Sequence, residues 1–91
     1  MKVIMAKVEI YTTMFCPFCH QAKKLLKKKG VDFIEYDVSS DSAGRQKMTE
    51  RSNGGTSVPQ IFIDGKHVGG CDDIYELDMD DQLDPLLGIA S

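Results

Sequence analysis

The sequence predicts an α/β fold in which a four-stranded mixed sheet carries helices on both faces. Its first half alternates a β-type segment at 7–12, a helical pattern at 17–29 and a second β-type segment at 31–38. A strand–helix–strand unit with a helix of this length implies a parallel pair joined by a right-handed crossover. In the second half, two short β-type segments at 60–63 and 66–68 flank a turn, which indicates an antiparallel hairpin.

The first strand and the first helix are the most strongly marked elements. Residues 7–12 alternate in polarity and are rich in β-formers, as expected of a strand. In the helix, Ala22, Leu25 and Leu26 form an apolar stripe at helical spacing. Gly30 is expected to end this helix, because glycine tolerates the left-handed conformation common just after a helix.

The second helix is marked more weakly. It is expected to run from N-cap candidates at 39–42 to about Ser52. Its apolar stripe consists of Ala43 and Met48, and Gly44 weakens the helical pattern.

Two turns with glycine separate the remaining elements. The continuous apolar run at 60–63 is typical of a strand in the centre of a sheet, and Asp64-Gly65 is a strong hairpin signal. After Gly69-Gly70, Asp72 is expected to cap a last helix that runs to about Asp81. The element order is therefore β-α-β-α-β-β-α.

Length and composition indicate a single domain in a reducing compartment. We expect one domain over residues 1–91, in which residues 1–6 form an N-terminal extension. Three cysteines, two of them in one Cys-x-x-Cys, do not resemble the disulfide framework of a secreted protein. We expect neither a signal peptide nor a membrane span, and hence a cytoplasmic location.

The charge is unevenly distributed along the chain. Residues 1–31 hold seven lysines against Glu9 alone, and residues 60–91 hold eight acidic residues against Lys66. Either two oppositely charged helices that pair with each other, or a dipolar surface that steers charged partners, accounts for this pattern. A net charge of −3, without aromatic residues among the lysines, argues against nucleic acid as a partner.

The chemistry is concentrated in Cys16-Pro17-Phe18-Cys19, where the first strand leads into the first helix. This spacing places both sulfurs at one edge of the first helical turn, where free N–H groups and the helix dipole stabilise a thiolate. Cys16 is expected to be the exposed, activated nucleophile, and Cys19 the less accessible resolving thiol. Half of a metal site, or two incidental cysteines, is the alternative to redox chemistry.

Three motifs together resemble the glutaredoxin family, in particular its bacterial dithiol type. They are Cys16-Pro17-Phe18-Cys19-His20, Ser57-Val58-Pro59-Gln60-Ile61-Phe62-Ile63-Asp64-Gly65 and Gly69-Gly70-Cys71-Asp72-Asp73, and the resemblance runs from about Val8 to Leu87. It implies a thioredoxin fold and an enzyme, a glutathione–disulfide oxidoreductase. Such an enzyme uses glutathione as co-substrate to reduce protein disulfides and protein–glutathione mixed disulfides, and ribonucleotide reductase is a family-level candidate among its substrates.

The resemblance also implies a role for each motif residue. Cys16 is the nucleophile and Cys19 the resolving thiol, while Val58 pairs its backbone with the cysteinyl part of glutathione, next to a cis Pro59. An ordinary strand-entry proline is the alternative for Pro59. The free N–H groups after Gly69-Gly70 suit the γ-glutamyl carboxylate. The implied glutathione site consists of Thr13, Phe18, Ser57, Val58, Pro59, Gly70, Cys71 and Asp72.

Three positions depart from the family pattern. The family usually has a lysine at Thr13, a tyrosine at Phe18 and an arginine in the loop occupied here by Gly54-Gly55-Thr56. The lysine helps to hold the glycyl carboxylate of glutathione, so the source of that positive charge is open in this chain. Arg51 and Lys47 are the replacements considered from the sequence.

Metal carriage is the main competing function. Met14-x-Cys16-x-x-Cys19 matches the loop of copper chaperones, in which thiolates select Cu(I), but those domains have a βαββαβ order. An iron–sulfur cluster shared by two chains is disfavoured by Pro17 in glutaredoxin-like proteins. A redoxin driven by thioredoxin reductase is the nearest enzymatic alternative, and the segment 69–73 favours glutathione instead. We therefore expect a monomer with no metal and no membrane partner.

Smaller expectations concern single residues. Met5 is an alternative translation start, because the first four residues add nothing that the predicted fold needs. His20 and His67 are expected to be exposed, and Cys71 is expected to act mainly through its backbone.

Overall fold

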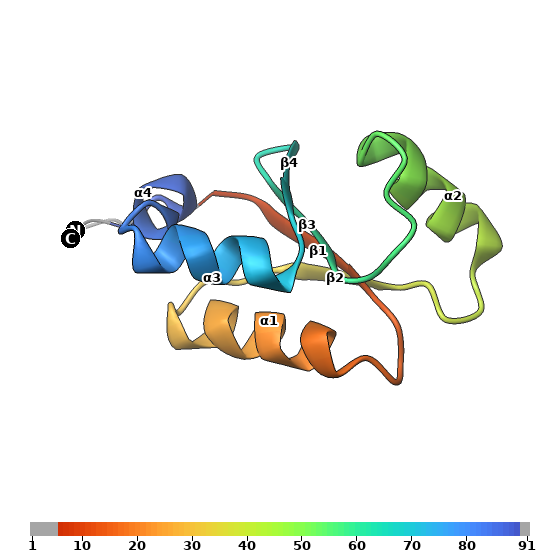
Figure 1. The fold of residues 1–91 in the computed structure, drawn as a ribbon, viewed down its shortest axis with the longest axis horizontal. Coiled ribbons are helices and arrows are strands. Elements are labelled where there is room, and N and C mark those ends of the chain that lie inside the picture. Colours follow the sequence, from red (N-terminus) through yellow and green to blue (C-terminus); the bar gives the residue numbers. More distant parts are fainter. Residues whose placement is uncertain (1–5, 90–91) are drawn as a thin grey trace.

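Within residues 6–89 the sheet has four strands, and the first of them in sequence lies in its interior. The computed structural model describes residues 6–89. The strands β1 (Val8–Thr12), β2 (Ile34–Asp37), β3 (Gln60–Ile63) and β4 (Lys66–Gly69) lie in the order β2-β1-β3-β4. β1 and β2 are parallel, whereas β1–β3 and β3–β4 are antiparallel. The predicted mixed sheet, a parallel pair followed by a hairpin, is confirmed (Figure 1).

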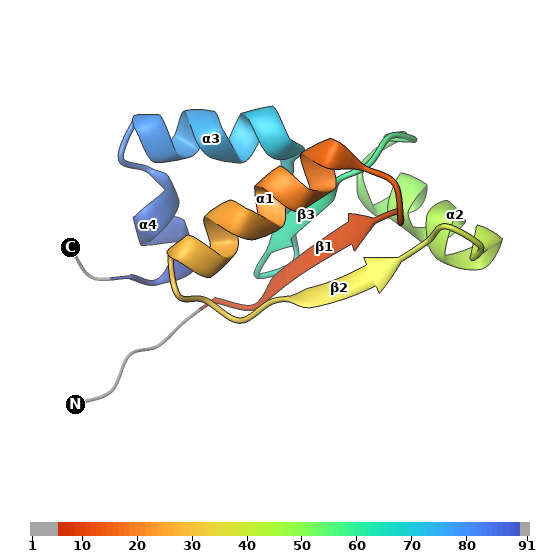
Figure 2. The same ribbon diagram turned by 90° about the horizontal axis from the view of Figure 1, so that it is seen from below.

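Helices cover both faces of the sheet, as predicted. α1 (Pro17–Lys28) and α3 (Cys71–Met79) lie side by side on one face, and the short α4 (Leu83–Leu87) follows α3 (Figure 2). α2 (Ser42–Arg51) packs on the other face. The alternation of β1 explains the two layers, because successive side chains of a strand point to opposite faces. Val8 and Ile10 belong to the α1 and α3 side, whereas Tyr11 belongs to the α2 side.

The larger apolar core lies between the sheet and α1, α3 and α4. Ala22, Leu25 and Leu26, the stripe predicted for the first helix, are all buried there. Ile74 of α3 and Leu87 of α4 are fully buried in the same cluster. Each such buried leucine or isoleucine side chain contributes roughly 1.5–3 kcal/mol of hydrophobic stabilisation. This face of the sheet therefore supplies more of the apolar stabilisation than the face under α2.

α2 is attached to the sheet by few side chains. Met48 is fully buried in a small cluster with aromatic residues of the sheet. Ala43, predicted to lie on the apolar stripe with Met48, is exposed, so that expectation was wrong. Gly44, Met48 and Arg51 are spaced so that they share one face of the helix. This face is directed at the sheet instead of the face that contains Ala43.

An ion pair between Arg51 and Glu9 completes the attachment of α2 to β1. Arg51 Nη2 donates to Glu9 Oε1 at 2.9 Å and Arg51 Nη1 donates to Glu9 Oε2 at 3.2 Å, a two-point geometry that strengthens the pair. Nη1 also donates to the hydroxyl oxygen of Tyr11 at 3.0 Å, and the hydroxyl of Tyr36 donates to Glu9 at 2.8 Å. The guanidinium lies over the ring of Phe62, with Cζ 4.1 Å from the ring centroid.

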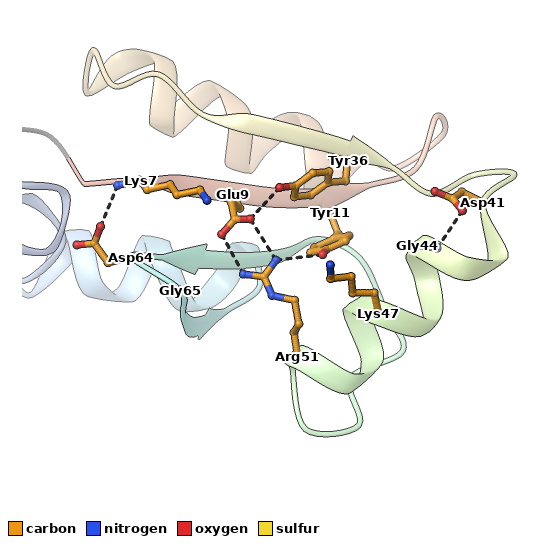
Figure 3. A pocket seen from close by; sticks show the side chains of 10 residues that line it. All are labelled: Lys7, Glu9, Tyr11, Tyr36, Asp41, Gly44, Lys47, Arg51, Asp64 and Gly65. Atoms are coloured by element: carbon orange, nitrogen blue, oxygen red, sulfur yellow. Dashed lines mark hydrogen bonds and ion pairs between the residues drawn. The ribbon is translucent and has the colours of Figure 1, made fainter.

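An open cavity of about 760 Å³ lies between α2 and the sheet, and its floor is formed by Glu9, Tyr11, Tyr36 and Arg51. Figure 3 shows Lys7 and Lys47 extending toward this floor from two sides. The hydrogen bond from Arg51 lowers the pKa of Glu9, and the hydrogen bond to Glu9 raises the pKa of Tyr36. The polar groups at the floor are paired with one another. The cavity is therefore part of the structural attachment of α2 to the sheet, and no ligand is assigned to it.

The second strand is shorter than the sequence predicted. The pattern placed it at 31–38, but only Ile34–Asp37 pairs with β1. Val31 and Val38 are buried just outside the strand, one in each of the two apolar clusters. The apolar residues at both ends of the pattern therefore serve the cores and lie outside the hydrogen-bonded ladder.

Within residues 6–89, no helix is long and apolar enough to cross a membrane. The alternative start at Met5, and most of the expected extension 1–6, lie outside the described residues.

Replacing Glu9 with glutamine should lower the free energy of unfolding by about 2 kcal/mol near neutral pH, because the change removes charge-assisted hydrogen bonds at a buried site. Arg51 holds the pKa of Glu9 below its ordinary value of 4.5. The stabilisation is therefore present above that value and is lost as the pH falls through the lowered pKa. Urea unfolding of both proteins, from about pH 7 down to about pH 3, measures the difference. A difference that stays constant over this range would contradict the assignment.

Candidate active site

The Cys-x-x-Cys motif lies where β1 ends and α1 begins. Cys16 is the N-cap residue of α1, and its Sγ accepts a hydrogen bond from the N–H of Cys19 at 3.1 Å. Pro17 occupies the start of the helix, as predicted. The sulfur takes the place of the side-chain oxygen that usually caps a helix, so the positive end of α1 is directed at it.

Cys16 and Cys19 form a disulfide in the structure. Cys16 is 7% exposed and Cys19 is 0% exposed, so the predicted order of access is confirmed. The expectation of an openly exposed Cys16 was wrong, because the loop before Pro59 packs against it. Its Sγ lies 3.8 Å from the carbonyl oxygen of Val58. Of the two sulfurs, only that of Cys16 is accessible to an attacking thiolate.

A groove of about 190 Å³ lies beside this motif, between the loop at 57–59 and the start of α3. The Val58–Pro59 peptide bond is cis, as the resemblance implied. The groove is lined by Phe18, Ser57, Val58, Pro59, Gly70, Cys71, Asp72 and Asp73. The first seven of these are residues of the expected glutathione site, so the structure brings them together. Thr13, the eighth expected residue, lines a different cavity.

α3 begins earlier than the sequence predicted. Gly70 is the N-cap residue, and its N–H donates to Asp73 Oδ2 at 2.8 Å. Asp72 is exposed in the first turn, so the expectation that it caps the helix was wrong. The Gly69-Gly70 turn places Cys71 at the first helical position, which moves the cap two residues back. A glycine cap has no side chain to cover the first-turn N–H groups, so they stay available to the groove.

Two glycines allow the start of α3 to lie close to the Pro59 loop. Gly69 has a φ of +118°, which other residues rarely adopt, and a Cβ there would overlap the carboxylate of Asp73. A Cβ on Gly70 would lie 3.2 Å from the carbonyl oxygen of Pro59. The absence of a side chain at Gly70 thus lets the start of α3 approach the Pro59 loop, and its absence at Gly69 leaves room for Asp73.

Cys71 lines the groove without offering a reactive thiol. Its side chain is buried in the larger apolar core. Burial, together with the nearby charge of Asp72, raises the pKa of the Cys71 thiol, which disfavours the nucleophilic thiolate. Its contribution to the groove is therefore made by its backbone, in line with the sequence-based expectation.

Arg45 is a residue near the site that the sequence reasoning missed. A cavity of about 450 Å³ is lined by Thr13, Met14, Phe15, Ser39, Ser40 and Arg45. Arg45 Nη1 donates to the carbonyl oxygen of Thr56 at 3.2 Å, so the guanidinium connects the cavity of Thr13 to the loop before Pro59. Arg51, one of the two cations considered from the sequence, is instead paired with Glu9. Lys47, the other, lines the cavity that contains this pair.

The fold differs from that of the copper chaperones, the main competing metal carriers. Within residues 6–89, no group of three or more His, Cys, Asp or Glu side chains is placed to hold a metal ion. Over the same residues the element order ends in α3 and α4, which differs from the βαββαβ order of the copper chaperones. His20 and His67 are exposed, as expected.

A pair of cysteines that caps a helix, beside a cis-proline loop on a four-stranded mixed sheet, defines a thiol–disulfide redox protein with the thioredoxin fold. The family model described as glutaredoxin matches residues 8–68. Glutaredoxin 3 of Escherichia coli K12 is 58% identical over 83 residues, which cover 91% of this chain and 99% of the relative. The chain therefore belongs to the glutaredoxin family, and it is an oxidoreductase with Cys16 and Cys19 as its redox pair.

Solved structures agree with this assignment. Glutaredoxin from Brucella melitensis is 49% identical and superposes with a TM-score of 0.81, covering 92% of this chain and 90% of that chain. A buckwheat glutaredoxin–glutathione complex is 28% identical and superposes with a TM-score of 0.82, covering 93% of this chain and 83% of that chain.

Replacing Gly69 with alanine should lower the free energy of unfolding by about 2 kcal/mol, because the change adds left-handed backbone strain and an overlap with Asp73. Gly30→Ala is the matched control, since its φ is +75° and a Cβ there meets no atom within 4 Å. The control should lose only the backbone term of about 1 kcal/mol. Urea unfolding compares the two variants, and equal losses would show that Asp73 moves aside without cost.

Proposed function

We propose that this glutaredoxin reduces protein disulfides and protein–glutathione mixed disulfides, with glutathione as its co-substrate. The observation that carries the proposal is the groove beside Cys16, in which seven residues expected to bind glutathione converge from three segments of the chain. A relative with the same fold is described as a complex with glutathione, which supports this ligand.

Cys16 performs the first step of the proposed reaction. Its thiolate attacks one sulfur of a protein disulfide, which forms a mixed disulfide and releases the other protein sulfur as a thiolate that takes up a proton. Cys16 is suited to this step because its sulfur is the accessible one and lies at the positive end of α1. The N–H of Cys19, 3.1 Å from Cys16 Sγ, stabilises negative charge on that sulfur.

Cys19 performs the second step. Deprotonated Cys19 attacks Cys16 Sγ, which forms the Cys16–Cys19 disulfide and releases the second protein thiol. One glutathione thiolate then attacks Cys16 and frees Cys19, and a second glutathione removes the first as glutathione disulfide. Two electrons thus pass from two glutathione molecules to one protein disulfide. With a glutathionylated protein, attack by Cys16 and removal by glutathione suffice.

The groove and the neighbouring Arg45 together offer a partner for each part of glutathione. The backbone of Val58 is placed to pair with the cysteinyl residue, which holds its sulfur beside Cys16. The first-turn N–H groups of α3 suit the γ-glutamyl carboxylate, and the carboxylate of Asp72 suits its ammonium. We assign the glycyl carboxylate to Arg45, because its guanidinium reaches the loop before Pro59 from the cavity of Thr13.

The biological setting follows from the proposed chemistry. A glutathione-driven reductase needs a reducing compartment, so we place the protein in the cytoplasm, acting as a monomer. Its partners are proteins with exposed disulfides or with cysteines linked to glutathione, among which ribonucleotide reductase is a family-level candidate. A coupled assay with hydroxyethyl disulfide, glutathione, glutathione reductase and NADPH tests the core of the proposal, and no NADPH oxidation above background would refute it.

Mutation should distinguish the roles of the Cys16 and Cys19 thiols. Cys16→Ser should abolish both activities, because every step begins or ends on Cys16 Sγ. Cys19→Ser should keep the removal of glutathione from a protein and lose the reduction of a protein disulfide, because only the latter needs a resolving thiol. Release of glutathione from a glutathionylated protein and reduction of an intramolecular disulfide measure the two activities. Equal losses in the two variants would overturn these roles.

Removing the charge of Arg45 should weaken glutathione binding. Arg45→Met should raise the KM for glutathione roughly fivefold, which is the size expected for an ion pair at a partly exposed site. Thr13→Lys in the Arg45→Met background should restore most of the affinity and lose this benefit at high salt. Lys47→Met is the matched control, since it removes a positive charge from α2 but lines the cavity on the other side. A KM that rises equally in both methionine variants would mean that only the overall charge matters.

A further inference from the structure

Two large apolar side chains stand exposed immediately before the nucleophile in the sequence. Met14 is 59% exposed and Phe15 is 91% exposed, and Phe15 directly precedes Cys16. We propose that Met14 and Phe15, here called the apolar rim, bind the segment of a protein substrate that carries the target cysteine. The enzyme then prefers substrates with apolar residues beside that cysteine. This inference rests on the proposed function and adds a substrate class to it.

The apolar rim is held in place by the fold. The N–H of Met14 donates to Ser39 Oγ at 2.7 Å, which ties the β1–α1 loop to the chain that follows β2. The N–H of Val38 donates to the carbonyl oxygen of Thr12 at 2.8 Å, just before the same loop. The rim is therefore presented to solvent on an anchored turn. Local hydrogen bonding keeps it there even though burying a phenylalanine side chain is favourable by roughly 1.5–3 kcal/mol.

The geometry of disulfide exchange identifies the occupant. A partner sulfur must contact Cys16 Sγ, whose surroundings already include the Val58 carbonyl and the disulfide-bonded Cys19. A neighbouring residue in an extended partner segment lies only about 3.3 Å further along the chain. Because Phe15 is the residue bonded to Cys16, the side chains beside the target cysteine come within reach of the apolar rim. The rim is thus continuous with the place where the partner must dock.

The groove and the apolar rim divide the recognition of a glutathionylated protein. The lining of the groove does not include Met14 or Phe15, whereas it includes the residues assigned to the cysteinyl and γ-glutamyl parts of glutathione. Met14 and Phe15 share their cavity with Arg45, so only the glycyl end of glutathione approaches the rim. The protein half of the mixed disulfide then contacts the rim. On this side, the favourable free energy of substrate binding grows in proportion to the apolar surface that the partner's flanking residues remove from water.

Two glutathionylated peptides test the inference. They have the same length and net charge, but one carries leucine and the other serine on both sides of the cysteine. The wild-type enzyme should deglutathionylate the leucine peptide about tenfold faster in kcat/KM, a difference of about 1.4 kcal/mol. Phe15→Thr should reduce this ratio to less than threefold, because the apolar contact is lost. Each kcat/KM is divided by the value for hydroxyethyl disulfide, which has no flanking residues. Met79→Thr is the matched control, because Met79 is 81% exposed at the far end of α3, and it should keep the full ratio.

Each outcome bears on one proposal only. Absence of a leucine preference in the wild type, or a preference that survives Phe15→Thr and Met14→Thr, overturns the apolar rim while leaving the proposed function intact. Absence of activity toward hydroxyethyl disulfide and both peptides overturns the proposed function itself. A second copy of the chain is the other possible occupant of the rim, and sedimentation at assay concentrations tests for it. A wild-type dimer that Phe15→Thr converts to a monomer would show that the rim binds a second copy. That result would also overturn the inference.

Discussion

The bond between Arg51 and Glu9 is the constraint on which the geometry of the site depends. α2 buries Met48 alone among its own residues, so apolar packing by itself attaches it weakly to the sheet. The two-point ion pair, with the guanidinium stacked on Phe62, fixes the last turn of α2 against β1 and β3. The chain leaves this turn and enters the loop that ends in Val58 and Pro59. The position of the Val58 carbonyl beside Cys16 is therefore set indirectly by the Arg51–Glu9 pair, which lies on the face of the sheet that α2 covers.

Most of the fold could be predicted because its signals are local. The apolar stripe of the first helix, the continuous run at 60–63 and the Asp64-Gly65 turn each specify an element within a few residues. The cap position of Cys16 was also accessible, since Pro17 follows it and the helical pattern begins there. Family motifs then brought the loop at 57–59 and the start of α3 together, which periodicity could not do. These features gave the parallel pair and the hairpin of the mixed sheet, and seven of the eight residues expected around glutathione.

What could not be predicted depends on contacts between residues far apart in the chain. Nothing near Arg51 in the sequence indicates that its partner is Glu9, and nothing near Arg45 indicates that it faces the cavity of Thr13. The cap of α3 lies at Gly70, two residues before the predicted Asp72. Its position is decided by how the turn packs on Pro59 and not by capping preference. The cover over Cys16 was missed for the same reason, since it comes from the Val58 loop.

The burial of Cys71 determines how many oxidation states the molecule can adopt. With its thiol inside the apolar core and its ionisation disfavoured, this sulfur is withheld from oxidants and from exchange with the neighbouring pair. The three cysteines therefore behave as one two-electron couple, dithiol or disulfide, without scrambled pairings. A chain with three sulfurs near one groove thus retains a single well-defined redox potential, which is what a carrier between a thiol pool and its targets requires.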